Sequence, residues 1–252
     1  MFPNLTVTGG GRGIGLSLAR AAAELGSDIA VLDMLEHPHD EFLSIPDEFT
    51  VRAKYYRTNV TDMGSLTTAF DQIIQDLGRI DNCVTAAGIV LDKPFLDTTW
   101  EEGTKILEVN VLGSYFAAQL AAKRMRDQKT GGSIVLIASI SASAALPTQK
   151  LGIYGASKGA IKSLCQQLAV ELGPLGIRVN SVSPGFIETE MTKGLAVTNP
   201  EIISAFNSAT PLQRIGKRQD LKTLVGYLLS DAAAFTTGSD IFVTGGLHSG
   251  HL

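Results

Sequence analysis

Tyr154 and Lys158 stand four residues apart in the stretch Tyr-Gly-Ala-Ser-Lys, inside a run of small and apolar residues typical of a buried helix. On a helix, residues i and i+4 share one face, about 6 Å apart at Cβ. A free tyrosine has a pKa of about 10 and is a poor base at neutral pH. A cation about 4 Å away, at an effective dielectric constant of about 20, lowers that pKa by up to about three units. The spacing therefore predicts a general acid/base, although a core tyrosine beside a snorkelling lysine has the same spacing.

A second chemical signal is the stretch Thr-Gly-Gly-Gly-Arg-Gly-Ile-Gly at residues 8–15, between an expected strand and an expected helix. Its five glycines leave little side chain at the junction, so backbone amides and the helix N-terminus can approach a phosphate closely. Asp33 ends the next expected strand, where an acidic residue reaches an adenosine ribose in dinucleotide folds. The alternative is a tight strand–helix turn without a ligand, which the placement of Asp33 disfavours.

The elements that must position these residues alternate between two periods. Short β-rich runs predict strands at 5–8, 28–33, 53–60, 82–87, 133–138, 177–182 and 240–244, and apolar spacing predicts helices at 13–25, 62–77, 99–127, 155–173 and 218–230. Strands that are apolar on both faces, each followed by a helix, indicate an α/β fold with a parallel sheet covered on both sides. We expect one domain over residues 1–252, with a loop-rich region at 186–217.

Composition narrows the class of protein further. The chain has 252 residues, 44% hydrophobic and 18% charged, and a net charge of −4 without a basic stripe, which argues against nucleic acid. No 18-residue apolar run and no signal-peptide pattern occur, so we expect a cytoplasmic protein without a membrane span. Its two cysteines, Cys83 and Cys165, lie in apolar runs and fit a reducing compartment. The four histidines form no cluster, so no metal site is expected.

Taken together, the motifs resemble those of the short-chain dehydrogenase/reductase family over residues 4 to 246, nearly the whole chain. The resemblance is carried by Thr-Gly-x-x-x-Gly-Ile-Gly at 8–15, Asp33, Ala-Ala-Gly at 86–88, Asn110, a serine after the fifth strand, Tyr154, Lys158 and Pro-Gly at 184–185. It implies a Rossmann-type, seven-stranded parallel sheet and NAD(P)-linked hydride transfer on an alcohol or carbonyl group.

The resemblance also implies catalytic roles. Tyr154 is then the acid/base, Lys158 lowers its pKa and binds the nicotinamide ribose, and Asn110 holds a water that links Lys158 to solvent. Ser139 is expected to donate a hydrogen bond to the reacting oxygen. Ser139 precedes Tyr154 by fifteen residues where family members often show thirteen, a spacing that Ser141 satisfies; Ser139 is preferred because it aligns with the strand end.

For the cofactor, the resemblance assigns contacts along the whole chain. These are Gly9, Arg12, Gly13, Ile14, Gly15, Asp33, Asn59, Val60, Ala86, Ala87, Gly88, Tyr154, Lys158, Pro184, Gly185, Ile187 and Thr189. Asn59 replaces the usual aspartate at the adenine pocket but keeps an acceptor and a donor. Thr85, where the family usually has an asparagine, changes a side chain in a segment whose role is played by the backbone.

The sequence also supports expectations about the cofactor, the substrate and the oligomeric state. The Asp33 carboxylate repels a 2′-phosphate and is expected to outweigh Arg12, so NAD(H) is preferred and NADP(H) is not excluded. The pattern is similar to fungal-type polyol and ketose reductases, but residues 140–150 and 186–215 offer polar candidates (Gln149, Lys150, Glu188, Asn207) and apolar ones (Leu146, Leu151, Met191, Phe206). A polyol or ketose and a hydrophobic ketone both stay open as substrates, and a non-catalytic redox sensor or scaffold is the alternative class. A homotetramer or homodimer built on 99–127 and 155–173 is expected.

Overall fold

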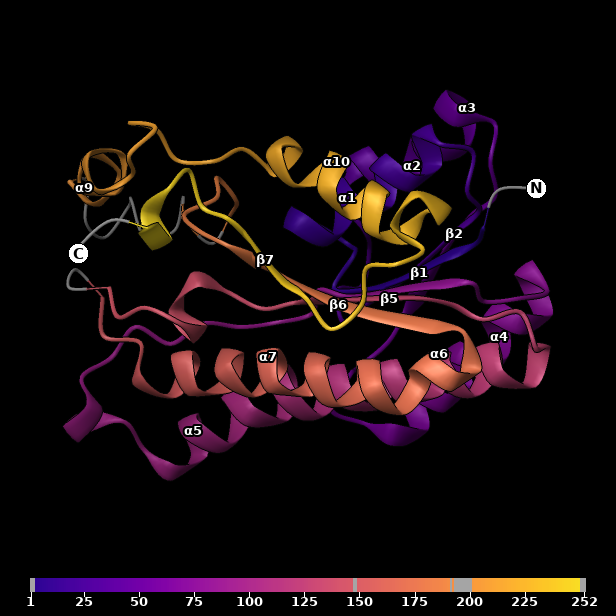
Figure 1. Ribbon diagram of the computed structural model, residues 1–252, viewed down its shortest axis with the longest axis horizontal. Helices are drawn as coiled ribbons and strands as arrows, with labels where there is room; N and C mark the ends of the chain where they lie inside the picture. The colour runs from indigo at the N-terminus through magenta and orange to yellow at the C-terminus, as the bar shows by residue number, and fades with distance from the viewer. Residues whose placement is uncertain (1–2, 147–148, 191, 193–200, 250–252) are drawn as a thin grey trace.

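All seven strands of the computed structural model lie in one parallel sheet with the order β3-β2-β1-β4-β5-β6-β7 (Figure 1). The structure describes residues 3–146, 149–190, 192 and 201–249. The strands are β1 Leu5–Thr8, β2 Ile29–Asp33, β3 Ala53–Arg57, β4 Asn82–Thr85, β5 Gly132–Ile137, β6 Ile177–Pro184 and β7 Asp240–Val243. The chain leaves β1 toward β2 and β3 on one side and returns at β4 on the other. A crevice is expected at this reversal, outside the carboxyl ends of the strands.

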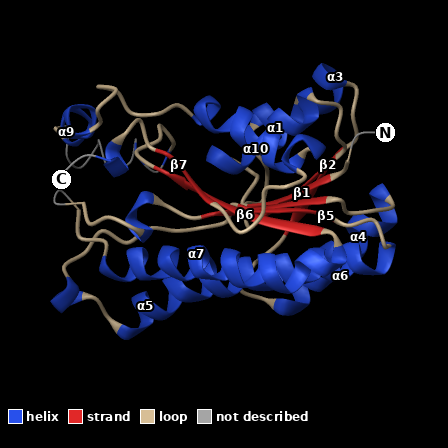
Figure 2. Cartoon of the chain, in the orientation of Figure 1, coloured by secondary structure: helices blue, strands red, loops and turns tan. Residues whose placement is uncertain are grey.

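Helices cover both faces of this sheet, as the layers of Figure 2 show. One face carries α1 Gly13–Glu24, the short helices α2 Asp40–Leu43 and α3 Ile45–Phe49, and α10 Lys222–Leu229. The other carries α4 Met63–Leu77, α5 Trp100–Leu107, α6 Ser114–Gln128 and α7 Gly152–Leu172. Helix α9, Ile202–Ala209, lies beyond the end of the sheet (Figure 1). The alternating pattern predicts a parallel sheet covered on both sides, and the family resemblance implies this Rossmann-type arrangement.

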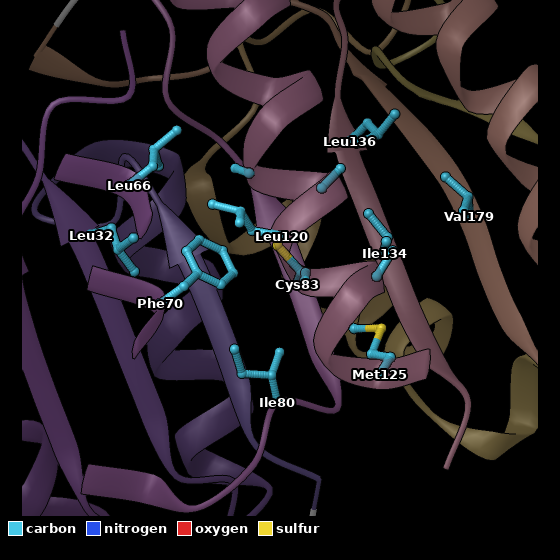
Figure 3. Close-up of a cluster of buried hydrophobic side chains, with 14 of the residues drawn as sticks. Leu32, Leu66, Phe70, Ile80, Cys83, Leu120, Met125, Ile134, Leu136 and Val179 are labelled. Carbon is cyan, nitrogen blue, oxygen red and sulfur yellow. The ribbon is translucent and has the colours of Figure 1, made fainter. Parts of the chain in front are cut away.

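The core has two layers because the strands are buried on both faces. Leu32, Cys83 and Ile134 point to the layer under α4, α6 and α7, where Phe70 and Met125 are fully buried (Figure 3). The opposite layer packs β-strand residues against α1 and α10. At about 25 cal/mol per Å² of apolar surface removed from water, such burial is the main term that stabilises the sheet.

One helical run departs from the α-geometry at a position that matters for the site. The sequence predicts a single helix over 99–127, and the chain is helical from Trp100 to Gln128. Residues Glu108–Gly113 between α5 and α6, however, form a π-helical segment. A π-bulge shifts the register of the side chains on a helix, and such bulges are frequent at functional sites. Here the segment contains Asn110, which is fully buried.

The sequence pattern predicted all seven strands and missed only short helices. Strands 53–60 and 82–87 end earlier than predicted, at Arg57 and Thr85, because the chain turns there into loops at the carboxyl edge. Helices α2, α3 and α9, of four, five and eight residues, are too short for a clear period. Among the described residues, no helix is long and apolar enough to cross a membrane.

Candidate active site

A cleft of about 1260 Å³ opens at the carboxyl ends of the strands. It brings together segments from the whole length of the chain, from the glycine-rich turn after β1 to the loop after β6. The residues predicted to contact the cofactor all line it: Gly9, Arg12, Gly13, Ile14, Gly15, Asp33, Asn59, Val60, Ala86, Ala87, Gly88, Tyr154, Lys158, Pro184, Gly185, Ile187 and Thr189. Ser139 lines it as well.

The turn after β1 requires glycine at two positions for measurable reasons. Gly9 has a φ of +67°, and a Cβ there would lie 2.5 Å from the Cα of Ala87, in the loop after β4. A Cβ on Gly15 would lie 2.2 Å from the Gly9 carbonyl oxygen. The turn therefore packs directly on the first turn of α1 and on the neighbouring loop. That leaves a cradle of backbone without side chains at the crevice.

Helix α1 begins at Gly13, and its N-cap residue, Arg12, makes no capping hydrogen bond with its side chain. The exposed amides and the positive end of the helix dipole are a favourable site for an anionic group. The residues that are present therefore fit a diphosphate, as the glycine spacing predicts.

Asp33 is fixed against this turn by two backbone amides. Its Oδ2 accepts from the Gly11 amide at 2.9 Å and its Oδ1 accepts from the Leu35 amide at 3.1 Å. A Cβ on Gly11 would lie 2.9 Å from the Asp33 carboxyl carbon, so glycine is needed for this approach. A carboxylate offers about four acceptor positions, which leaves two toward the cleft.

At the adenine end predicted from the sequence, Asn59 and Val60 have different surroundings. The Asn59 Oδ1 accepts from the amide and the hydroxyl of Thr61, at 3.1 and 2.9 Å, so its Nδ2 is the group left to meet a ligand. Val60 packs against the π-helical segment, where a Cβ on Gly113 would lie 2.8 Å from its Cγ2. The buried Thr58 also lines the cleft, a residue that the sequence reasoning did not single out.

Tyr154 and Lys158 lie one turn apart near the start of α7, as their spacing predicts. The Lys158 Nζ donates to the Ile137 carbonyl oxygen at 2.8 Å and lies 5.8 Å from the centroid of the Tyr154 ring. Lys158 is only 6% exposed. A Cβ on Gly88 would be in ordinary van der Waals contact with the Lys158 Nζ, at 3.5 Å, so the loop after β4 lies directly beside the ammonium.

The electrostatics of this pair differ from the sequence argument. The spacing of the two residues predicts that Lys158 lowers the pKa of Tyr154. Burial instead raises the pKa of Tyr154 above its ordinary value, because the phenolate loses solvation. The opposing influence is a hydrogen bond with the Ser139 side chain, which lowers the pKa of Tyr154. Burial also lowers the pKa of Lys158 to about 8. A phenol that keeps its proton at neutral pH is suited to act as an acid.

The structure distinguishes between the two candidate serines. Ser139 lines the cleft and shares a hydrogen bond with Tyr154. Ser141 does not line the cleft; its hydroxyl and its amide both donate to the Ser139 Oγ, at 3.0 and 3.2 Å. Because these bonds occupy acceptor positions of the Ser139 Oγ, its own proton is free to point toward Tyr154 or a substrate.

Asn110 joins three segments around Lys158. Its Oδ1 accepts from the Ile89 amide at 2.9 Å, and its Nδ2 donates to the Ile89 carbonyl and to the Ser157 Oγ, both at 3.0 Å. Ser157 in turn donates to the Tyr154 carbonyl at 2.7 Å. All polar atoms of this buried amide are therefore satisfied. Asn110 connects the π-helical segment, the loop after β4 and helix α7.

The substrate candidates named from the sequence separate into two groups. Leu146, Gln149, Leu151 and Phe206 line the cleft, whereas Lys150, Glu188 and Asn207 do not, and Met191 lies outside the described residues. The Asn207 Oδ1 accepts instead from the Ile215 amide at 2.8 Å.

One wall of the cleft was missed by the sequence reasoning. It is formed by α5 and the start of the π-helical segment, with Trp100, Glu101, Thr104, Lys105 and Glu108. Their spacing of three and four residues places them on one face of the helix, a signal that was available in the sequence. They make this wall more polar than the sequence alone suggested.

The three histidines among the described residues, His37, His39 and His248, do not line this cleft. His248 stacks on Phe242, with centroids 4.4 Å apart, and its Nδ1 lies 2.6 Å from the Thr244 hydroxyl. Among the described residues, no three His, Cys, Asp or Glu side chains are grouped so that they could hold a metal ion. His251 lies outside the described residues.

The fold and the cleft define an oxidoreductase that uses a nicotinamide dinucleotide. They combine a diphosphate cradle, a carboxylate at the second strand and a tyrosine–serine pair at the far end. The family model described as "Enoyl-(Acyl carrier protein) reductase" matches residues 9–248. A sorbose reductase from Schizosaccharomyces pombe is 35% identical over 243 residues, which cover 95% of this chain and 93% of that protein.

Two further comparisons agree. An NADP-dependent (R)-specific alcohol dehydrogenase from Lentilactobacillus kefiri is 33% identical, with 95% of this chain and 94% of that protein covered. The crystal structure of a short-chain type dehydrogenase/reductase from Mycobacterium marinum superposes with a TM-score of 0.90 at 38% identity, covering 97% of this chain and 95% of that one. The chain belongs to the short-chain dehydrogenase/reductase family. It is an NAD(P)-dependent enzyme that acts on alcohols. The comparisons therefore support the enzyme class over the alternative class, a non-catalytic sensor or scaffold.

Because burial lowers the pKa of Lys158, we expect the free energy of unfolding to depend on pH. Below about pH 8 the ammonium is charged in the folded and the unfolded state, and its burial costs stability. Between about pH 8 and the unfolded value of 10.5 the folded state has lost this proton, so stability rises with pH. We expect the difference in unfolding free energy between the wild type and Lys158→Met to shift by about 2 kcal/mol in favour of the wild type from pH 7 to 10. Urea unfolding at several pH values measures it, and a difference independent of pH would show that Lys158 is not buried as a titrating amine.

Proposed function

We propose that the protein interconverts a secondary alcohol and a ketone, with a polyol or ketose as substrate and NAD(H) as the preferred cofactor. The observation that carries the catalytic part is a group of side chains at one end of the cleft: Ser139 beside Tyr154, Lys158 one turn further along α7, and the buried Asn110, which is bonded to α7 through Ser157. These side chains come from three places in the chain, the end of β5, the π-helical segment and α7, which a tyrosine packed only for stability does not require.

In the reduction direction, Tyr154 donates its phenolic proton to the carbonyl oxygen of the substrate. Ser139 donates a hydrogen bond to the same oxygen and stabilises the negative charge that develops there. The dinucleotide, when bound, supplies the hydride. Lys158, held by the Ile137 carbonyl, donates to the nicotinamide ribose and stabilises the phenolate that remains. Asn110 fixes the π-helical segment at Lys158, and the second acceptor position of its Oδ1 would hold the water that returns a proton from solvent.

In this proposal the dinucleotide lies along the line of predicted contacts. The turn at Gly9–Gly15 and the start of α1 would hold its diphosphate, and Asn59 and Val60 would contact its adenine. Tyr154 and the loop after β6 would hold its nicotinamide: the Ile187 backbone would bond to the carboxamide, and Thr189 would reach the carboxamide or a phosphate. The region 186–217 serves as the substrate loop. In it Phe206 of α9 stacks on Phe186 with ring centroids 3.6 Å apart, which ties α9 to the cleft.

A sugar-like substrate is supported by the sorbose reductase relative and by the polar residues of the cleft. Gln149 and the charged face of α5 offer partners for hydroxyl groups. A hydrophobic ketone remains the second candidate, because Leu146, Leu151, Phe186 and Phe206 line the same region. The protein's two cysteines are free and buried, which supports our proposal of a reducing, cytoplasmic compartment.

The acid/base role is tested by Tyr154→Phe, which removes the phenolic proton and keeps the ring. We expect turnover to fall by a factor of about 10² to 10⁴ while the cofactor still binds. Tyr227→Phe, which loses only a hydrogen bond to Thr236 at the surface, is the matched control and keeps wild-type turnover. If the Tyr154 variant retains more than about a tenth of wild-type turnover, the role is wrong.

The cofactor preference is tested at Asp33. Repulsion between its carboxylate and a 2′-phosphate amounts to about one or a few kcal/mol, so we expect the wild type to favour NADH over NADPH by about tenfold to a few hundredfold. Asp33→Ala is expected to shift the ratio of kcat/KM toward NADPH, and Asp33→Asn, which keeps an acceptor, to shift it less. If Asp33 has only a structural role, Asp33→Ala lowers kcat/KM equally with both cofactors. A wild type that favours NADPH contradicts the proposal.

We further propose that the enzyme is a homotetramer or homodimer with α5, α6 and α7 at the interface. The exposed apolar side chains on these elements and between α5 and α6 include Leu107, Leu112, Tyr115 and Val170, more than a monomer surface needs. Size-exclusion chromatography with light scattering at micromolar concentration should give two or four chains per particle. Leu112→Glu should shift the mass toward the monomer, and a monomeric wild type would rule out the proposal.

A further inference from the structure

Two loops at the substrate end of the cleft are joined through Asp92. The Asp92 Oδ1 accepts from the Lys150 amide at 2.9 Å, and its Oδ2 lies 3.5 Å from the Gln149 Nε2, which donates to it. The Lys93 amide donates to the Lys150 carbonyl at 3.0 Å, so the backbones are paired as well. These bonds attach the segment after β4 to the segment that leads into α7, five residues before Tyr154.

This contact determines which way the Gln149 side chain points. A carboxylate can only accept hydrogen bonds, so it is the Nε2 of the amide, and not its Oε1, that faces Asp92. Gln149 lines the cleft, whereas Asp92 does not. The Oε1 is bonded to none of the described residues. It therefore remains free to accept a hydrogen bond, on a residue that lines the cleft.

The neighbours of Gln149 make that acceptor distinctive. Leu146 and Leu151, on either side of it in the chain, also line the cleft, and Phe186 and Phe206 do so from the loop after β6 and from α9. An acceptor flanked by these apolar side chains favours a ligand with a hydroxyl donor at that point and disfavours one with only acceptors there, because an acceptor facing an acceptor is left unpaired.

We propose that Gln149, oriented by Asp92, accepts a hydrogen bond from a hydroxyl group that the substrate carries beside its reacting carbon. The site then selects α-hydroxy ketones, and in reverse vicinal diols, over ketones whose neighbouring oxygen has no proton. Asp92 is a positioning residue and Gln149 a specificity-determining one. This inference rests on the proposed function and narrows its substrate class.

Hydroxyacetone and methoxyacetone are the probe pair, because they differ in whether the neighbouring oxygen can donate. The measured quantity is the ratio of their kcat/KM values, with NADH and NADPH each supplied. We expect the wild type to favour hydroxyacetone, and Gln149→Leu to lower this ratio by about tenfold, the effect of one hydrogen bond of moderate strength.

Asp92→Asn tests the orientation itself. Its oxygen still accepts from the Lys150 amide, so its Nδ2 faces Gln149 and turns the Gln149 amide, whose Nε2 then points into the cleft. A donor there serves a hydroxyl and a methoxy oxygen alike, so the ratio should fall although Gln149 is unchanged. Asp92→Asn combined with Gln149→Glu restores an acceptor in the cleft and should restore the ratio.

Lys93→Met is the matched control. It removes the ion pair between Lys93 and Glu102, 2.8 Å, from the same loop but leaves both Asp92 contacts, so the ratio should stay at the wild-type value. An unchanged ratio in Gln149→Leu, or no restoration in the double variant, would overturn the inference while the proposed function stands. No reduction of either ketone or of sorbose by the wild type would overturn the proposed function, and this inference with it.

Discussion

The burial of the Asn110 amide is the constraint on which the arrangement of the site depends. An amide removed from water must find partners for its oxygen and its nitrogen, since each group left unpaired costs about 1 to 3 kcal/mol. Asn110 finds them in the backbone of Ile89 and in Ser157, which belong to two other segments. The π-helical turn that displaces Asn110 from a regular helix is stabilised in this way. The same contacts fix the distance between the loop after β4 and the helix that carries Tyr154 and Lys158.

A second constraint operates at the other end of the cleft, where side chains are excluded. The turn after β1 lies so close to Ala87 that only glycine fits at position 9, and a side chain at position 11 would displace the Asp33 carboxylate from the turn. The strand order reverses between β1 and β4, and the backbone amides of the turn are concentrated at that reversal. One half of the cleft is thus formed largely by the backbone of this turn, and the other by side chains from helices and loops.

This difference explains how much could be predicted from the sequence. The seven strands and the dinucleotide half were predictable, because alternating periods and glycine spacing are local signals that one stretch of chain carries alone. The direction in which the pKa of Tyr154 shifts was not predictable, because burial by distant segments outweighs the effect of the neighbour four residues away. The wall formed by α5 was missed although its residues share one helix face, since nothing local shows what that face meets.

The substrate half of the cleft is harder to predict from the sequence, for a physical reason. Its residues come from α5, the loop after β4, the segment before α7, the loop after β6 and α9, and no single stretch contributes more than a few of them. Specificity there depends on how one segment orients a side chain of another, as Asp92 orients Gln149. A carboxylate outside the cleft thereby decides whether the group inside is a donor or an acceptor. Two proteins that share a tyrosine at the position of Tyr154 can therefore differ in substrate through residues that never touch the substrate.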